Sequence, residues 1–104
     1  MSVIYEVNLK IQKRIEKEFQ SWLVGHIQDV LAIDGFESAT WFKVSDPIDE
    51  KGMLHWTMHY FLRDRPALDS YLEKHAPRLR QPAKEKFGDQ FEASRRTLET
   101  VQEY

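Results

Sequence analysis

Hydrophobic and polar residues alternate along the first part of the chain, and the period then changes. Residues 3–10 carry an apolar side chain at every second position, whereas Glu6 and Asn8 occupy positions between them. This period of two predicts a strand with one buried face. From Gln12 the apolar positions recur at helical spacing and form one stripe, made up of Ile15, Phe19, Trp22, Leu23, His26, Ile27, Val30 and Leu31. The stripe predicts an amphipathic helix that stops at Gly35.

The next part of the chain shows strand-like patterns again, followed by a second helix start. Residues 36–44 and 53–62 alternate and flank a turn-rich segment at 45–52, which predicts a β-hairpin. The sequence Asp64-Arg65-Pro66 is typical of a helix start, because proline is tolerated in the first turn.

Two prolines interrupt the second predicted helix. Pro77 and Pro82 each lack the backbone N–H that a helix interior uses, so we expect a kink or a break near Ala76. Gly88 ends the helical region, and residues 91–101 predict a final strand.

The resulting order of elements, β-α-β-β-α-β, predicts a single domain over residues 1–104. We expect this domain to belong to the α+β class and to have a ferredoxin-like fold, in which a four-stranded antiparallel sheet carries two helices on one face. We expect the more apolar sheet face to meet the helices. That face is made up of Tyr5, Val7, Leu9, Trp56, Met58 and Tyr60.

The opposite sheet face is mixed in character. Ile4, Phe61 and either Trp41 or Phe42 make it too apolar for full exposure to water. It is also too polar for a core, because it carries Asn8, His55, Thr57 and His59. Such a mixture predicts a homodimer surface. The alternative is a sheet open to water with scattered apolar side chains.

Charge and composition exclude several functions. The chain has 15 basic and 17 acidic side chains, a net charge of -2, which argues against a nucleic-acid-binding protein. It contains no cysteine, so disulfides, thiolate metal sites and cysteine nucleophiles are excluded. Residues 1–9 do not resemble a signal peptide, and no apolar run approaches the ~20 residues needed to span a bilayer. We therefore expect a cytoplasmic protein without membrane association.

Several segments of the sequence are similar to a known family. They are Ile4-Tyr5-Glu6-Val7, Trp22 with His26-Ile27-Gln28-Asp29-Val30-Leu31, Gly35-Phe36, Tyr60 before Arg63-Asp64-Arg65, Leu68 with Tyr71, Ala76-Pro77-Arg78-Leu79-Arg80, and Phe87-Gly88-Asp89 with Phe91, Ala93, Arg95 and Leu98. On these segments the chain resembles a bacterial domain of unknown function, family 4286, which is related in shape to the dimeric α/β-barrel proteins. The resemblance implies a ferredoxin-like fold and a homodimer but no activity. One departure is Trp56, where the family usually carries tyrosine.

Two histidines are candidates for chemistry. His26 lies on the apolar stripe of the first predicted helix, one turn from Trp22 and from Val30. It is either a core histidine with one hydrogen-bonded nitrogen or a proton-exchanging group that lines a cleft. His75 directly precedes the expected helix break, where it either caps free carbonyl groups or marks a functional bend.

The basic and aromatic candidates also allow two interpretations each. Arg78 and Arg80 are suited to clamp a carboxylate or phosphate, or they form a solvated helix end paired with nearby acidic side chains. Tyr5, Trp56 and Tyr60 are expected to cluster on adjacent strands. They form either ordinary core or the apolar wall of a ligand pocket.

No metal site or cofactor site is predicted. His55 and His59 share one strand face but lie roughly 13 Å apart, too far to bind one ion together. Some dimeric α/β-barrel proteins degrade haem with an asparagine, a tryptophan and a histidine, and Asn8, Trp56 and His75 are the corresponding residue types. Because Asn8 and Trp56 are predicted to face opposite sides of the sheet, we expect this match to be accidental.

Two functions remain open from the sequence. The first is a small-molecule-binding module with its cleft between the helices and the sheet. As an enzyme it would work without a cofactor, with His26 as general acid or base and Tyr60 as its partner. The alternative is a non-enzymatic homodimeric adaptor or regulator that uses the mixed sheet face. The ligand-binding candidates are Tyr5, Trp56, His75, Arg78 and Arg95.

Overall fold

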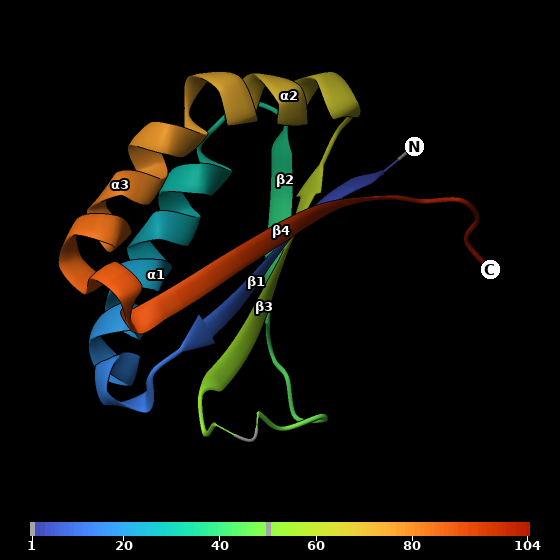
Figure 1. Ribbon diagram of the computed structural model, residues 1–104. Helices are drawn as coiled ribbons and strands as arrows, with labels where there is room; N and C mark the ends of the chain where they lie inside the picture. The colour runs from blue at the N-terminus through green and yellow to red at the C-terminus, as the bar shows by residue number, and fades with distance from the viewer. Residues whose placement is uncertain (1, 50) are drawn as a thin grey trace.

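A computed structural model describes residues 2–49 and 51–104 and shows a sheet with its helices on one face (Figure 1). The elements are β1 (Val3–Ile11), η1 (Lys13–Ile15), α1 (Glu16–Leu31), β2 (Phe36–Lys43), β3 (Leu54–Leu62), α2 (Arg65–Lys74), α3 (Ala76–Phe87), η2 (Gly88–Gln90) and β4 (Phe91–Glu99). All neighbouring strands are antiparallel, in the order β2-β3-β1-β4. This is the predicted ferredoxin-like arrangement, and it places β1 at the centre between β3 and β4.

The helices cover different parts of the sheet (Figure 1). α1 and α3 pack together along one face, whereas α2 lies across one end of the sheet. The predicted break near Ala76 is confirmed, since α2 and α3 are separated by His75. Pro77 stands in the first turn of α3, where its missing N–H costs nothing. At the start of α2 the Asp64 carboxylate accepts a hydrogen bond of 2.9 Å from the Ala67 amide.

Several element boundaries differ slightly from the sequence prediction. Residues 13–15 form a 3-10 turn before α1 begins, β3 starts at Leu54, and β4 ends at Glu99. Within the turn-rich segment predicted at 45–52, Glu50 lies outside the described residues. These shifts of one or two residues are typical of element ends, which fray and tighten.

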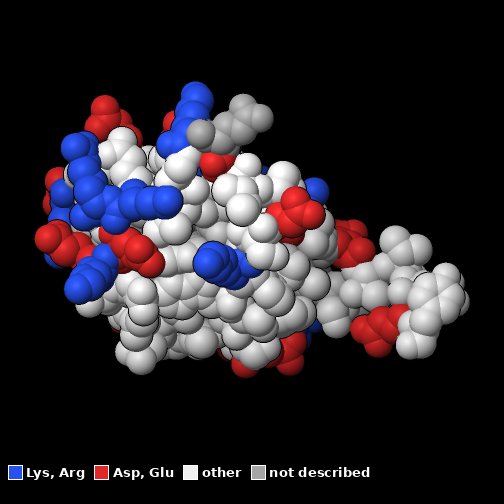
Figure 2. Space-filling view, turned by 90° about the horizontal axis from the view of Figure 1, so that it is seen from below, with Lys and Arg blue, Asp and Glu red and all other residues white. Residues whose placement is uncertain are grey.

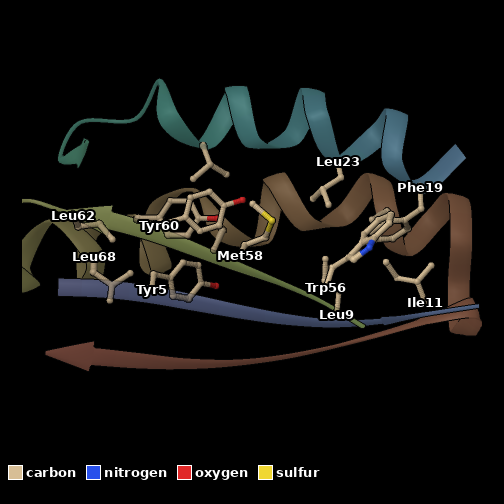
Figure 3. Close-up of a cluster of buried hydrophobic side chains, with 14 of the residues drawn as sticks. Tyr5, Leu9, Ile11, Phe19, Leu23, Trp56, Met58, Tyr60, Leu62 and Leu68 are labelled. Carbon is tan, nitrogen blue, oxygen red and sulfur yellow. The ribbon is translucent and has the colours of Figure 1, made fainter. Parts of the chain in front are cut away.

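The core lies between the sheet and the helices (Figure 3). As predicted, the apolar row of β1 and β3 faces the helices, and Tyr5, Met58 and Tyr60 expose 3% or less of their surface. Phe19 from α1 and Tyr71 from α2 meet this row and are equally buried. The helix-facing side of the sheet is therefore the face that also positions the candidate site.

The opposite sheet face is covered by none of the described helices (Figure 1). Trp41 packs toward the core, with its ring 4.8 Å from the ring of Trp56. Of these two candidates, Phe42 is therefore the one on the outer face, where it exposes 44% of its surface. Ile4 and Phe61, which are cross-strand neighbours on β1 and β3 of the same face, are half-buried.

Acidic and basic side chains lie next to one another on the face shown in Figure 2, without a continuous basic field there. The last residues of the chain project away from the body in both whole-molecule views (Figures 1 and 2). Val101 and Tyr104 in this segment are fully exposed. Among the described residues, no helix combines the length and the apolar character needed to cross a membrane.

Candidate functional site

A cavity of about 280 Å³ lies between the helices and the sheet. α1 and α3 line it on one side, and β1, β3 and β4 on the other. Most of the lining side chains are apolar or aromatic. The polar groups that reach it are phenols, one imidazole and three cationic side chains. Apolar walls with a few convergent polar groups are characteristic of small-ligand sites.

Three tyrosines form the first polar group of the cavity. Tyr5 and Tyr60 are direct cross-strand neighbours with ring centroids 6.0 Å apart, and Tyr71 meets Tyr5 edge-on at 5.8 Å. Burial raises the pKa of Tyr60, and the neighbouring phenols raise it further. Burial likewise raises the pKa of Tyr71 to about 12. Both hydroxyls therefore keep their protons at neutral pH and can donate hydrogen bonds.

His26 is the imidazole of the cavity. Its ring stacks on Trp22 at a centroid distance of 4.5 Å and an angle of 20°. Burial lowers the pKa of His26 from 6.5 to about 4; Asp29 opposes this shift, while Arg95 and Arg80 add to it. At neutral pH the ring is thus uncharged and can accept a proton or a hydrogen bond.

The cationic side chains come from two elements. Arg80 and Lys84 reach the cavity from α3, and Arg95 reaches it from β4. Arg95 pairs with Val7 in the sheet register, which places it on the helix-facing side. The guanidinium of Arg80 donates a hydrogen bond of 2.7 Å to the Tyr5 hydroxyl. This bond ties α3 to the central strand of the sheet.

The structure separates the candidates proposed from the sequence. Tyr5, His26, Tyr60 and Arg95 line the cavity together. The other three candidates lie outside its lining, namely Trp56, His75 and Arg78.

Each of these three has a different environment. Trp56 packs in the core, 6.4 Å from the ring of Phe19. The exposed Arg78 guanidinium lies 3.0 Å from Nδ1 of His75. Of the two arginines considered as an anion clamp, the structure therefore places Arg80 and not Arg78 in the cavity.

One cationic residue and one phenol of the cavity were not among the candidates. Lys84 stands one helical turn after Arg80, and this i, i+4 spacing was the available signal that both share one face of α3. Tyr71 lies on the apolar stripe of α2, and nothing in that pattern distinguishes a cavity phenol from an ordinary core residue.

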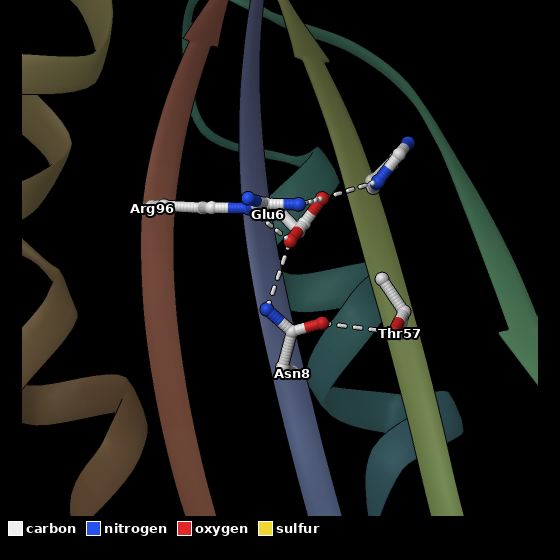
Figure 4. Close-up of polar contacts among 5 residues, drawn as sticks. Glu6, Asn8, Thr57 and Arg96 are labelled. Carbon is white, nitrogen blue, oxygen red and sulfur yellow. Dashed lines mark hydrogen bonds and ion pairs between the residues drawn. The ribbon is translucent and has the colours of Figure 1, made fainter. Parts of the chain in front are cut away.

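The outer face of the sheet carries a separate polar cluster, which we call the Glu6 network (Figure 4). The Glu6 carboxylate accepts hydrogen bonds from Asn8 at 2.9 Å and from Arg96 at 2.6 Å, and it contacts Nε2 of His59 at 2.9 Å. Thr57 extends the network by donating to the Asn8 side chain at 2.9 Å. These five residues link β4, β1 and β3 across the outer face.

Glu6 is buried although it lies on the outer face, with 4% of its surface exposed. Burial alone would raise the pKa of Glu6, but the hydrogen bonds from Arg96, Asn8 and His59 outweigh it and lower the pKa to about 2. The carboxylate is therefore ionised and fully paired at neutral pH. Nothing in the sequence alternation distinguished this residue from the solvated positions beside it.

The structure also decides the comparison with haem-degrading proteins. Asn8 belongs to the Glu6 network on the outer face, whereas Trp56 is buried on the helix-facing side. The two side chains therefore lie on opposite sides of the sheet, as the sequence predicted, and do not converge on one ligand. Among the described residues, no group of three or more histidine, aspartate or glutamate side chains could hold a metal ion.

Comparison with known families supports this architecture. The sequence model of a domain of unknown function, DUF4286, matches residues 2–101. The chain belongs to this family. Family membership confirms the resemblance seen in the sequence and carries no assigned activity. A search among curated proteins found no match.

Solved structures of several other proteins share the fold. A putative antibiotic biosynthesis monooxygenase from Deinococcus radiodurans superposes with a TM-score of 0.73 at 13% identity, covering 98% of this chain and 95% of that one. SnoaB, a cofactor-independent oxygenase from Streptomyces nogalater, gives 0.72 at 13% identity with the same coverage. Rv0793 from Mycobacterium tuberculosis gives 0.71 at 18% identity, covering 99% and 98%. At these identities the likeness shows a common fold alone.

We expect His26 to make this DUF4286 domain less stable in mild acid. The unfolded chain takes up a proton at His26 below pH 6.5, whereas the folded protein does so only near pH 4. Between these values the unfolded state binds more protons, so the free energy of unfolding falls as the pH falls. We expect the free energy of unfolding to fall by about 2 kcal/mol from pH 7 to pH 4. This value allows for the partial exposure of the ring, because solvent weakens the effect of burial on its pKa.

Urea denaturation at several pH values measures this effect in the wild type and in a His26→Gln variant. The other titrating groups are common to both proteins, including Asp29, Arg80 and Arg95 around the ring and Tyr60 across the cavity. The difference between the two stability curves therefore isolates His26. Parallel curves from pH 7 to pH 4 would show that the ring is not held neutral by burial.

Proposed function

We propose that the protein is a small-molecule-binding module that works as a homodimer of the dimeric α/β-barrel type. The cavity between helices and sheet carries this proposal, because close-packed protein interiors leave few voids larger than a water molecule. Its volume of about 280 Å³ lies just below the range for ligand pockets, roughly 300–1,000 Å³. A ligand of modest size therefore suits it.

The polar groups of the cavity support a cofactor-free reaction. The neutral ring of His26 can accept a proton, and the Tyr60 hydroxyl can donate a hydrogen bond to an oxygen of the ligand. A proton acceptor and a donor in one apolar pocket are what proton transfer on a bound molecule requires. The naming of one fold neighbour, SnoaB, as a cofactor-independent oxygenase also favours such a reaction.

The uncovered sheet face supports the homodimer. Phe42, Ile4 and Phe61 present apolar surface there, and the charge of Glu6 is already paired within its own chain. A second copy can cover these apolar side chains without leaving a buried carboxylate unpaired, which would be costly. A mixed surface of this kind is typical of interfaces between folded subunits.

The same face favours one alternative function, a non-enzymatic homodimeric adaptor or regulator. The Glu6 network holds the polar side chains of this face in fixed positions, as a recognition surface requires. In that function the cavity would hold no ligand, and the assembled dimer would be the active form.

Native mass spectrometry of the freshly purified protein tests the proposal. We expect a dimer that carries extra mass under gentle conditions and loses it on denaturation. An Ala93→Phe variant should be a dimer without the extra mass, because Ala93 lines the cavity and a phenyl ring would fill it. A Phe42→Glu variant should be monomeric, since the added carboxylate lies on the outer face.

Matched variants control for both substitutions. Ala32→Phe adds the same ring at an exposed position at the end of α1 and should keep the extra mass. Val24→Glu adds the same charge at a side chain with 45% exposure on α1 and should remain dimeric. A bare wild-type dimer would favour the adaptor, and a bare monomer would overturn both functions.

A further inference from the structure

The described lining of the cavity carries three cationic side chains and no acidic one. Arg80, Lys84 and Arg95 all line it, and none of the described lining residues is aspartate or glutamate. The whole chain has more acidic than basic side chains, 17 against 15. The positive excess is therefore a property of this site and not of the protein surface in general.

Neither arginine of the cavity has a carboxylate partner among the described residues. Of the five arginines elsewhere, Arg63, Arg65 and Arg96 are each paired with a carboxylate, whereas Arg14 and Arg78 are not. Arg80 instead donates to the Tyr5 hydroxyl, which orients the guanidinium but leaves its charge intact. Arg95 makes no side-chain hydrogen bond or ion pair with any described residue. Both keep donors available for a ligand.

The positive charge acts on groups inside the cavity. Burial is the main cause of the low pKa of His26, and Arg95 and Arg80 lower it further against the effect of Asp29. The same two arginines partly offset the burial that raises the pKa of Tyr71. An anion in the cavity would therefore be stabilised by both guanidinium groups.

The lining of the cavity is buried at one end and exposed at the other. We call Phe19, Leu23 and Met58 its floor, because they line the cavity and expose at most 2% of their surface. Figure 3 shows these three side chains within the core. Lys84 and Arg95 are exposed and mark its opening. The site therefore fits a molecule with an apolar body at the floor and a negative group at the opening.

We infer that the ligand is a small organic anion, a carboxylate on a body of one or two rings, held by Arg80 and Arg95. The inference rests on the proposed function, because it names the ligand chemistry of the same cavity. The planar guanidinium fork matches the two oxygens of a carboxylate. An apolar cavity of roughly 150 Å³ already takes benzene, so about 280 Å³ accommodates two fused rings.

A pair of probes with the same ring body and nearly the same shape tests this inference, namely the anion 2-naphthoate and its neutral amide, 2-naphthamide. Isothermal titration calorimetry of each into the purified protein should show at least 10-fold tighter binding of the carboxylate. Arg80→Gln and Arg95→Gln should each weaken naphthoate binding about 10-fold, as expected for loss of one charged hydrogen-bond donor. Neither should change the affinity for the amide.

Two controls keep the result interpretable. Arg95 is exposed and unpaired among the described residues, so Arg95→Gln should fold normally even if Arg80→Gln, which breaks the Tyr5 bond, does not. Arg14→Gln removes the same charge at an exposed position in η1, outside the cavity, and should leave both affinities unchanged.

The outcomes separate this inference from the proposed function. Equal affinity for the carboxylate and the amide would contradict the inference of an anionic ligand, but it would still support a small-molecule site in the cavity. Equal loss of affinity in Arg14→Gln and Arg95→Gln would also overturn it, by showing an effect of net charge alone. Failure of both probes to bind at millimolar concentration would overturn the proposed function as well.

Discussion

Replacing Phe19 with alanine is expected to lower the free energy of unfolding by about 4 kcal/mol. Phe19 is fully buried on α1, and its ring lies within 5.0–6.4 Å of the rings of Trp22, Trp56, Phe87 and Phe91. The substitution removes a phenyl ring from the close-packed core and leaves a void that the surrounding rings cannot close. Urea denaturation followed by circular dichroism measures the loss.

The control for this substitution is Val24→Ala on the same helix. Val24 exposes 45% of its surface, so its truncation should change stability by less than about 1 kcal/mol. A loss below about 1 kcal/mol in Phe19→Ala would mean that α1 does not pack on the sheet as described. Because Phe19 also lines the cavity, that result would remove the floor of the proposed ligand site.

Replacing Gly35 with alanine is expected to lower the free energy of unfolding by about 3 kcal/mol, through backbone strain and steric overlap together. Gly35 has a φ of 94°, a conformation that side-chain-bearing residues rarely adopt. An added Cβ would also overlap the Cβ of Ala67 on α2. The backbone has little room to adjust, because the Gly35 carbonyl accepts a hydrogen bond of 2.9 Å from the Arg63 amide.

Gly25 offers a matched control for the same substitution. It lies inside α1, and a Cβ there would meet nothing within 4 Å. Gly25→Ala should therefore stabilise the protein by about 1 kcal/mol, since alanine favours a helix over glycine. Thermal and urea denaturation of both variants should give shifts of opposite sign. Destabilisation of similar size at both positions would contradict the described packing of α2 on the turn at Gly35.

Local patterns in the sequence were sufficient for the elements of the fold. The alternation at residues 3–10 and 53–62 predicted which sheet face is buried, because a strand presents successive side chains to opposite faces. The break at His75 was also predicted, since Pro77 lacks the N–H that a helix interior uses, whereas Pro82 lies inside α3 and does not end it. These features depend on neighbours close along the chain, so no knowledge of the tertiary structure was needed.

The candidate site was only partly predicted, because it depends on contacts between distant segments. Arg80 and Arg95 share a cavity owing to the packing of α3 and the register of β4, which the sequence alone does not reveal. Arg78 looked equally suitable, yet two residues along a helix correspond to a turn of about 200° around its axis. The burial of Glu6 likewise depends on His59 and Arg96, which the sheet brings together from two other strands.

The central claim, a ligand site between helices and sheet, is tested most directly by methyl-resolved NMR during titration with 2-naphthoate. We predict that the methyl resonances of Leu23 and Met58 shift, because both side chains line the cavity. The methyl groups of Ile4 on the outer face and Val101 in the C-terminal segment should not move. Shifts confined to Ile4 and its neighbours, or no shifts at saturating probe, would contradict the claim.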